Sequence, residues 1–424
     1  MAHMQVIKEK MTKPLQDLRF LALELRKPLI TQVQDRLGLP TMPQVVDGTP
    51  SAHKMPQLDA LRAFAVLAVL FAHFVSHAPP WVTIIPWAAC GVQLFFVLSG
   101  FLITGILLDG RKEVETGTSR FWMLRQFYAR RFLRIIPLYY AVVLVGWIIK
   151  LPGFTKTVGW NLAYSTNFYI VLHGRWIDVA SHLWTLSVEE QFYLVWPWIV
   201  LFFPKKWLLP SFIGLAIFAM AFRVLAMGWF GPWLGVTPFA SLDCFGAGAL
   251  LAMAQRREIA GDPRLRRTVC GIGLCLGLAL FVLAIGWHIA PQSALGRLGA
   301  MNLAMTLLSA PLISGAAKGF TGILGSILTL RSIRYIGKIS YGIYIYHLPV
   351  WWTIDGSRWL NALPRIIPHS AVFLIATVTV AAISWHFFER PINRLKRLFP
   401  YREGQYDRKP EPQPPTLTQR MELN

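Results

Sequence analysis

The sequence predicts an all-α, polytopic membrane protein with about ten transmembrane helices. Of its 424 residues, 54% are hydrophobic and 15% are charged, whereas a soluble domain carries about 25% charged residues. A soluble fold of this size needs more charge to cover its surface, so the composition excludes that class. The same numbers exclude disorder for most of the chain.

The apolar residues are grouped into stretches that suit membrane spans, since a helix needs about 20 such residues to cross the hydrocarbon core. The run 320–330 is too short to cross, and we expect it to be re-entrant or interfacial. The ten expected spans, of which the third and ninth are the shortest, are 56–77, 91–109, 135–151, 183–203, 207–228, 237–255, 269–287, 299–317, 339–354 and 367–388.

The excess of basic residues is the second informative feature, with 42 Lys and Arg against 21 Asp and Glu and a net charge of +21. On a soluble protein this charge would indicate a nucleic-acid partner. Ten crossings instead place 34 of the 42 basic residues on one side of the bilayer. Since cytoplasmic loops are enriched in Lys and Arg, we expect both termini in the cytoplasm and no nucleic-acid partner.

Three regions are expected along the chain. Residues 1–55 form a cytoplasmic lead with an amphipathic helix on the inner leaflet or against a partner. Residues 56–395 form the membrane domain, and residues 396–424 form a disordered cytoplasmic tail rich in proline. The four cysteines lie in apolar runs without metal-ligand spacing, so we expect neither a metal site nor a disulfide framework.

Ionisable residues inside a span are costly, so they are candidates for function. Arg62 and His73 lie eleven residues apart in the first span. Eleven helical steps come within about 20° of whole turns, which places both residues on one face and about 16 Å apart along the axis. Arg62 is expected near the cytoplasm and His73 in the outer half.

Further polar residues are expected at the depth of His73 or near the midplane. Glu189 and Glu190 are adjacent in the fourth span, and at least one of them needs a partner. Ser340, Tyr344 and His347 share a helix face by their i, i+4, i+7 spacing. The predicted catalytic residues are Arg62, His73, Glu189, Glu190, Ser340, Tyr344 and His347, and the predicted substrate contacts are Trp184 and Asp243.

A cluster of basic residues is expected at the inner end of this polar cavity. Arg130, Arg131 and Arg134 precede the third span and suit a phosphate-rich cytosolic ligand. A histidine deeper in the membrane, with carboxylate partners, suits general-base chemistry on a hydroxyl. Structural packing of these polar residues is the alternative explanation for each of them.

Six segments in family order resemble the acyltransferase-3 family of membrane O-acyltransferases. The match as a whole covers roughly residues 56–395. The first segment carries the Arg, ten residues, His signature at Arg62 and His73. The remaining five segments are 91–104, 127–137, 184–193, 340–347 and 388–391. The resemblance implies transfer of an acyl group from cytosolic acyl-CoA, either acetyl-CoA or succinyl-CoA, to a hydroxyl of an extracytoplasmic saccharide at a bacterial inner membrane.

In the mechanism that we expect, the CoA phosphates bind the three arginines and the pantetheine arm extends past Arg62 to His73. His73 takes the proton of the acceptor hydroxyl, Glu189 or Glu190 orients His73, and Tyr344 or Ser340 polarises the thioester carbonyl. An acyl-enzyme on Ser187 or Ser340 is the alternative.

Two other functions stay open. The same spans and buried charges also describe a transporter or flippase that uses these residues for a proton relay, and the acceptor of an acyltransferase could be a small molecule other than a saccharide. The identity of the acyl group, the acceptor and the oligomeric state are not determined by the residues, and a homodimer is one option.

Overall fold

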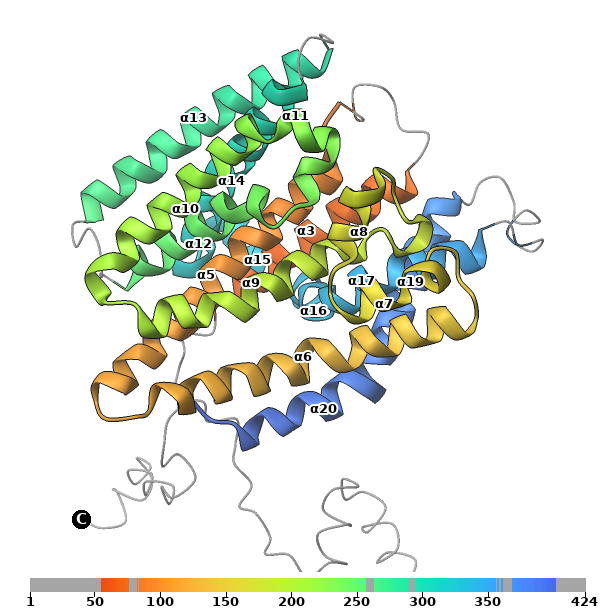
Figure 1. Ribbon diagram of the computed structural model, residues 1–424, viewed down its shortest axis with the longest axis horizontal. Coiled ribbons are helices and arrows are strands. Elements are labelled where there is room, and N and C mark those ends of the chain that lie inside the picture. The colour runs from red at the N-terminus through yellow and green to blue at the C-terminus, as the bar shows by residue number, and fades with distance from the viewer. Residues whose placement is uncertain are drawn as a thin grey trace, which may run out of the picture. The chain divides into compact units, whose positions relative to one another are not determined.

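The computed structural model describes residues 55–75, 82, 84–256, 263–289, 294–355, 357, 360 and 368–401. Within them all regular structure is helical and no strand occurs, so the predicted all-α class is confirmed (Figure 1). The amphipathic helix predicted for the lead and the disordered tail predicted beyond residue 401 lie outside the described residues.

The helices alternate between long elements and short connecting ones (Figure 1). The first half of the chain contains α3 (Pro56–Phe74), α5 (Trp87–Glu115), α6 (Arg120–Ile148), α7 (Phe154–Leu162), α8 (Thr166–His173), η1 (Asp178–Ala180), α9 (Leu183–Phe202), α10 (Lys205–Leu225), α11 (Met227–Phe230) and η2 (Gly231–Val236). The second half contains η3 (Phe239–Ser241), α12 (Leu242–Gln255), α13 (Pro263–Ile289), α14 (Ala294–Lys318), α15 (Gly322–Thr329), α16 (Arg331–Lys338), α17 (Ser340–Ile354), α19 (His369–Ser384), η4 (Trp385–Glu389), α20 (Arg390–Arg394) and η5 (Leu395–Leu398).

Several helices are long and apolar enough to cross a bilayer, as expected of a multi-pass membrane protein. A bent pair, Met227–Val236 followed by Phe239–Gln255 at 68°, provides one more candidate span. Among the described residues the six unbent candidates are Pro56–Phe74, Trp87–Glu115, Arg120–Ile148, Lys205–Leu225, Gly299–Lys318 and His369–Leu398.

This count is lower than the predicted ten because three expected spans correspond to helices that are shorter or more polar. The predicted ninth span is α17, which has only 15 residues. The predicted fourth span is α9, a 20-residue helix that contains two adjacent carboxylates and is not among these candidates. The predicted seventh lies in α13, whose apolar part is Cys270–Gly286. The ten-span topology and the cytoplasmic placement of both termini therefore remain predictions.

The segment predicted to be too short to cross forms α15, an eight-residue helix that spans only about 12 Å. It follows a turn that is fixed to α3 by one side chain. The amide of Gln57 donates to the Phe320 carbonyl at 2.9 Å and accepts from the Phe320 N–H at 2.7 Å. The polar backbone of this turn is thus satisfied beside the first helix.

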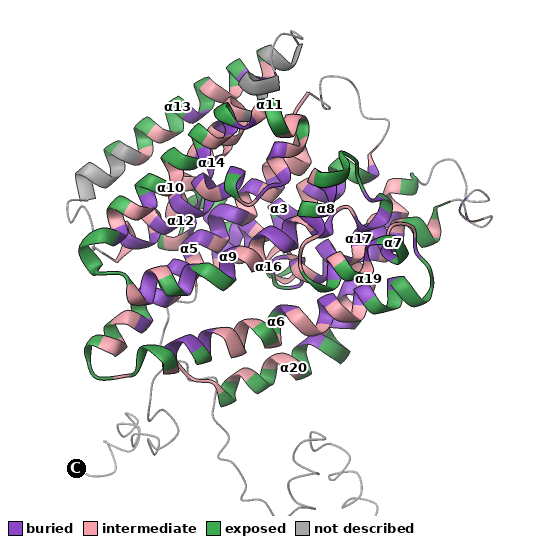
Figure 2. Ribbon diagram, viewed as in Figure 1, coloured by how far each residue is buried: buried purple, intermediate pink, exposed green. Residues whose placement is uncertain are grey.

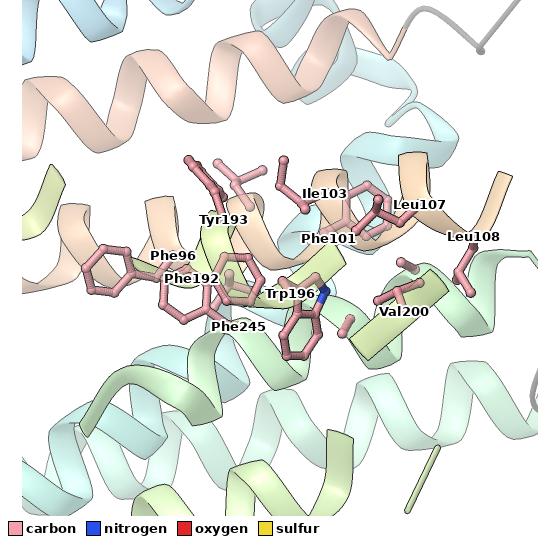
Figure 3. Packing of buried hydrophobic residues seen from close by; sticks show 14 of the residues in the cluster. Phe96, Phe101, Ile103, Leu107, Leu108, Phe192, Tyr193, Trp196, Val200 and Phe245 are labelled. Atoms are coloured by element: carbon pink, nitrogen blue, oxygen red, sulfur yellow. The ribbon is translucent and has the colours of Figure 1, made fainter. Parts of the chain in front are cut away.

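An aromatic core joins α5, α9 and α12 (Figure 3). Phe192 on α9 stacks on Phe245 on α12 with 4.0 Å between ring centroids, and the Trp196 indole donates to the Thr104 hydroxyl at 2.8 Å. In lipid such packing and interhelical hydrogen bonds drive helix association, because the lipid tails are as apolar as the side chains. In Figure 2 buried residues accordingly concentrate on these inner helices, whereas α13 presents exposed residues.

The other side of the domain holds α3, α6, α17 and α19 around a second group of buried side chains. In Figure 1, α6 lies beside α20, which continues from α19 through a π-helical turn over Trp385–Glu389. Such turns interrupt the regular helix ladder and often mark functional positions. Here the turn directs Glu389, which is 5% exposed, toward Gly342 on α17.

Candidate functional site

Three histidines from separate elements meet at one end of the domain. The ring of His347 on α17 lies 5.0 Å, centroid to centroid, from the ring of His73 on α3 and 5.0 Å from the ring of His182. His182 directly precedes α9. His347 is completely buried, His182 is 4% exposed and His73 is exposed. The cluster therefore has one member that an outside molecule can reach.

The hydrogen bonds of two rings determine which nitrogen is free. Nδ1 of His73 lies 2.9 Å from the Val69 carbonyl oxygen, and Nδ1 of His347 bonds the Tyr344 carbonyl. A carbonyl only accepts, so each Nδ1 carries the proton and each neutral ring has its lone pair on Nε2. Nε2 of His347 is buried without a partner among the described residues.

His182 and Tyr344 fix the beginning of α9 to α17. The two ring nitrogens of His182 each lie 3.0 Å from a carbonyl oxygen, those of Val179 and Ile345. The Tyr344 hydroxyl bonds the Thr185 hydroxyl at 2.7 Å and donates to the His182 carbonyl at 3.2 Å. Tyr344 thus lies beside the cluster, as predicted from its spacing to His347.

Ser340, the third residue of that predicted face, lies farther away. It is the first residue of α17 and is 5% exposed. Seven helical residues separate it from His347, which is about 10 Å along the axis. A hydroxyl at that depth is not beside the histidine rings.

The carboxylate of Glu189 has a different environment from the one expected. Its Oε1 accepts from the Ser99 hydroxyl on α5 at 2.7 Å, and Ser99 also contacts the Tyr193 hydroxyl at 3.0 Å. The contact that the structure shows for Glu189 is therefore with Ser99, and its expected role in orienting His73 stays a prediction. Glu189 lies seven residues from His182, which is about 10 Å farther along α9.

Glu189 instead belongs with the basic residues. The charges of Arg131, Arg134 and Arg62 act on its carboxylate. The Arg131 guanidinium lies 5.0 Å from the centroid of the Tyr193 ring. Arg62 forms a 2.7 Å ion pair with Asp59, three residues earlier on α3. The predicted basic cluster is therefore formed by α3 and α6, and Glu189 of α9 lies within its field.

Arg130 has a structural partner of its own. Its guanidinium donates to the carbonyls of Lys396 and Phe399 at 2.9 and 3.0 Å and lies 4.8 Å from the centroid of the Tyr401 ring. Burial raises the pKa of the Tyr401 hydroxyl, which therefore stays neutral. Arg130 holds the segment after α20, whereas Arg134 on the same helix is exposed.

The two predicted substrate contacts lie in the aromatic core and at an internal ion pair. Asp243 pairs with Arg223 through two hydrogen bonds of 3.0 and 2.7 Å, and both side chains are almost fully buried. Trp184 is half-buried and contacts Phe96 edge to face, at 6.3 Å between centroids. The ion pair accounts for the buried carboxylate of Asp243 without a substrate.

Glu190, the remaining predicted residue, projects from α9 beside Glu189. Its Oε1 is buried and has no hydrogen-bond partner among the described residues. The adjacency of two carboxylates predicted different faces, and the structure agrees, because only Glu189 bonds Ser99.

Sequence reasoning missed His182, Thr185 and Ser99 as members of these clusters. His182 stands two residues before the 184–193 segment, and its proximity to that segment was the one available signal. Its contact with Ile345 joins residues 163 positions apart and follows from helix packing.

Comparisons with known proteins identify the family of this chain. A family model described as an acyltransferase domain matches residues 55–388. The chain is 30% identical over 367 residues to peptidoglycan O-acetyltransferase OatA of Listeria monocytogenes, covering 80% of this chain and 56% of that protein. It is 27% identical to the putative peptidoglycan O-acetyltransferase YrhL of Bacillus subtilis, covering 80% and 55%.

A third relative is O-acetyltransferase OatA of Staphylococcus aureus, 23% identical over 84% of this chain and 61% of that protein. The chain thus spans little more than half the length of the curated relatives that it matches. No solved structure matches. The family match covers most of the chain and includes all three histidines of the cluster, so the chain belongs to the acyltransferase-3 family of integral membrane O-acyltransferases.

Proposed function

We propose that this protein transfers an acetyl group from cytosolic acetyl-CoA to a hydroxyl of an extracytoplasmic cell-wall saccharide. Family membership supports O-acyl transfer, and the names of the relatives support acetyl as the group and peptidoglycan as the class of acceptor. Succinyl-CoA is the second donor to be tested. The location that follows is a bacterial plasma membrane, with the acceptor on the outer side.

The observation that carries the proposal is the exposed His73 ring held against buried His347. Because Nδ1 of His73 donates to the Val69 carbonyl, its Nε2 lone pair is available as a general base. Nε2 takes the proton of the acceptor hydroxyl while the hydroxyl oxygen attacks the thioester carbonyl carbon. The carbon–sulfur bond then breaks, and the CoA thiolate takes the proton from the imidazolium.

His347 assists this proton transfer from the buried side of the His73 ring. Its unpartnered Nε2 is an acceptor close to the ring that becomes positively charged. In a buried site such an acceptor has a large electrostatic effect because little water screens it. Ring contacts with His182 and with Tyr344 hold His347 in place.

The donor enters from the basic cluster. Arg131 and Arg134 bind the CoA phosphates, and Arg62 lies eleven residues from His73, about 16 Å along α3. An extended acyl-pantetheine arm covers that distance. Arg130 acts indirectly, by holding the segment after α20 beside the other two arginines.

The test uses the full chain purified in detergent with acetyl-CoA and a soluble peptidoglycan fragment. We expect thiol release and acetylated product from the wild type, and loss of both by at least about 100-fold for His73→Ala. The matched control is His386→Ala, because His386 is exposed and its Nδ1 bonds a backbone carbonyl four residues earlier.

Three outcomes would overturn the proposal. Wild-type turnover in His73→Ala would exclude His73 as the base. Transport of a labelled saccharide without thiol release would favour a transporter, and acetylation only of small non-saccharide hydroxyls would change the acceptor class. The mass of the purified protein in detergent tests whether it forms a homodimer.

A further inference from the structure

Two helices present their polar residues in the same order between the histidine cluster and the basic cluster. His182, which directly precedes α9, lies at the histidine end, and Tyr193 on α9 lies at the arginine end. The two are eleven residues apart, about 16 Å along the axis. This equals the separation of His73 and Arg62 on α3. Glu190 lies eight residues from His182, between the two ends.

Two buried polar atoms in this middle region have no partner among the described residues. They are Oε1 of Glu190 and the hydroxyl oxygen of Tyr164, which lies between α7 and α8. The side-chain amide of Gln191, the residue after Glu190, donates to the Tyr164 carbonyl at 2.8 Å, so the two residues belong to neighbouring segments of the fold. A buried polar group without a hydrogen bond is unfavourable, so two such groups in neighbouring segments indicate a ligand.

The hydroxyl of Tyr164 differs from those of the neighbouring tyrosines, which all donate to a backbone carbonyl. The hydroxyl of Tyr139 donates to the Asn161 carbonyl at 2.8 Å, and that of Tyr140 donates to the Leu162 carbonyl at 3.0 Å. Tyr341 donates to the Ile135 carbonyl at 2.9 Å. Tyr164 stacks on Tyr139 at 4.0 Å but lacks such an acceptor.

The backbone of Tyr164 is held in an unusual conformation. Its φ is +50°, a left-handed value that is uncommon for residues other than glycine. The Gln191 amide donates to its carbonyl at 2.8 Å, and its N–H donates to the Asn161 carbonyl at 3.0 Å. Strained residues persist where their surroundings determine them, and they concentrate at functional sites.

From this arrangement we infer that Glu190 and Tyr164 bind a secondary amide of the pantetheine arm, an inference that rests on acyl-CoA being the donor. The amide N–H donates to the Glu190 carboxylate, and the Tyr164 hydroxyl donates to the amide carbonyl. The pantetheine arm carries two such amides between the phosphates and the thioester. A contact at this depth aligns the thioester with His73.

The chemistry of the pair favours an amide over other occupants. A phosphate would be repelled by the Glu190 carboxylate. An acyl chain would leave Oε1 of Glu190 and the Tyr164 hydroxyl without a hydrogen-bond partner. Burial raises the pKa of the Tyr164 hydroxyl, so the hydroxyl stays a donor. A buried water is the remaining candidate for this position. If a water occupies it, kcat/KM should not depend on whether the acyl donor carries amides.

The experiment compares two donors with the purified full chain. S-acetylpantetheine carries both amides, and the S-acetyl ester of an alkanethiol of equal length carries none. We expect the wild type to prefer the amide donor by about tenfold or more in kcat/KM. Tyr164→Phe and Glu190→Ala should each reduce this preference to near unity, and Glu190→Gln, which keeps an acceptor, should retain part of it.

Tyr140→Phe is the matched control, because it removes a neighbouring hydroxyl that already has a backbone acceptor. It should keep the full preference. Thermal unfolding checks each variant, and isosteric Tyr164→Phe provides the test if Glu190→Ala does not fold. An unchanged preference in Tyr164→Phe and in a folded Glu190 variant would overturn the inference and indicate a bound water. Absence of acetyl-CoA turnover in the wild type would instead overturn the proposed function.

Discussion

The imidazole ring of His73 on α3 packs 5.0 Å from that of His347 on α17, although 274 positions separate them in the sequence. Each ring donates Nδ1–H to a carbonyl of its own helix, three or four residues earlier. Both rings therefore keep an Nε2 lone pair, one accessible and one buried. In the mechanism that we propose, His73 is the base that contacts the acceptor hydroxyl, and His347 supports the His73 ring.

His347→Asn should separate these roles. An asparagine amide reproduces the donor at Nδ1 but has nothing at Nε2, so the variant should fold while kcat falls by about 10- to 100-fold. KM for acetyl-CoA should stay within about twofold, since His347 lies away from the basic cluster. His173→Asn is the matched control, because the Nδ1 of His173 likewise bonds a backbone carbonyl of its own helix, that of Tyr169. Unchanged kcat in His347→Asn would contradict the supporting role.

Arg134→Ala should raise KM for acetyl-CoA by about tenfold with little effect on kcat, because it removes a phosphate-binding charge. The wild-type KM should rise with salt, and the variant should show a weaker salt dependence. Initial rates at several KCl concentrations measure both effects. Arg175→Ala, which removes a charge from the loop before η1, should leave KM and its salt dependence unchanged. Equal salt dependence in Arg134→Ala and the wild type would exclude phosphate binding by Arg134.

Arg130→Ala should loosen the segment that follows α20. Loss of its two bonds to the Lys396 and Phe399 carbonyls frees the segment after α20. Trypsin should then cleave after Lys396 and Arg397 several-fold faster than in the wild type, as followed by mass spectrometry. Arg125→Ala, on an exposed position of the same helix, is the control. Equal cleavage rates in Arg130→Ala and the wild type would show that Arg130 does not hold the segment.

Local spacing predicted the parts of the site that lie within one helix. The depth of His73 relative to Arg62 and the proximity of Tyr344 to His347 follow from helical geometry alone, and the structure retains both helices. The short helix over 322–329 was likewise predictable from length. The histidines were expected at one depth, but that they touch depends on packing.

Contacts between distant helices could not be predicted in this way. The Ser99 hydroxyl that bonds Glu189 comes from a helix 90 residues earlier, so the sequence did not show that this carboxylate has a partner other than His73. Asp243 presents the same difficulty, because its partner Arg223 stands on the preceding long helix. The sequence alone does not distinguish a buried carboxylate that binds a substrate from one that pairs with an arginine.

Asp243→Ala should destabilise the protein strongly because it leaves Arg223 buried without its counter-charge. Removing one partner of a buried pair costs about 3–5 kcal/mol, whereas an apolar replacement of both is often tolerated. Thermal unfolding in detergent should therefore show a large loss for Asp243→Ala and recovery in the double variant Arg223→Met, Asp243→Leu. The double variant should also retain acetyl transfer. A double variant that is stable but inactive would instead support the substrate contact that the sequence predicted for Asp243.

Gly248→Ala should weaken the contact between α12 and α5. A Cβ at this position would meet the backbone of Val97 and Phe101, where no flexible side chain can yield. Overpacking of this kind costs about 1–3 kcal/mol, so the unfolding temperature should fall. Gly271→Ala on α13 is the matched control, because a Cβ there meets no atom within 4 Å. Since alanine is favoured over glycine inside a helix by about 0.5–1 kcal/mol, the control should be neutral or slightly stabilised. Equal unfolding temperatures for the two variants would show that α12 and α5 do not approach each other this closely.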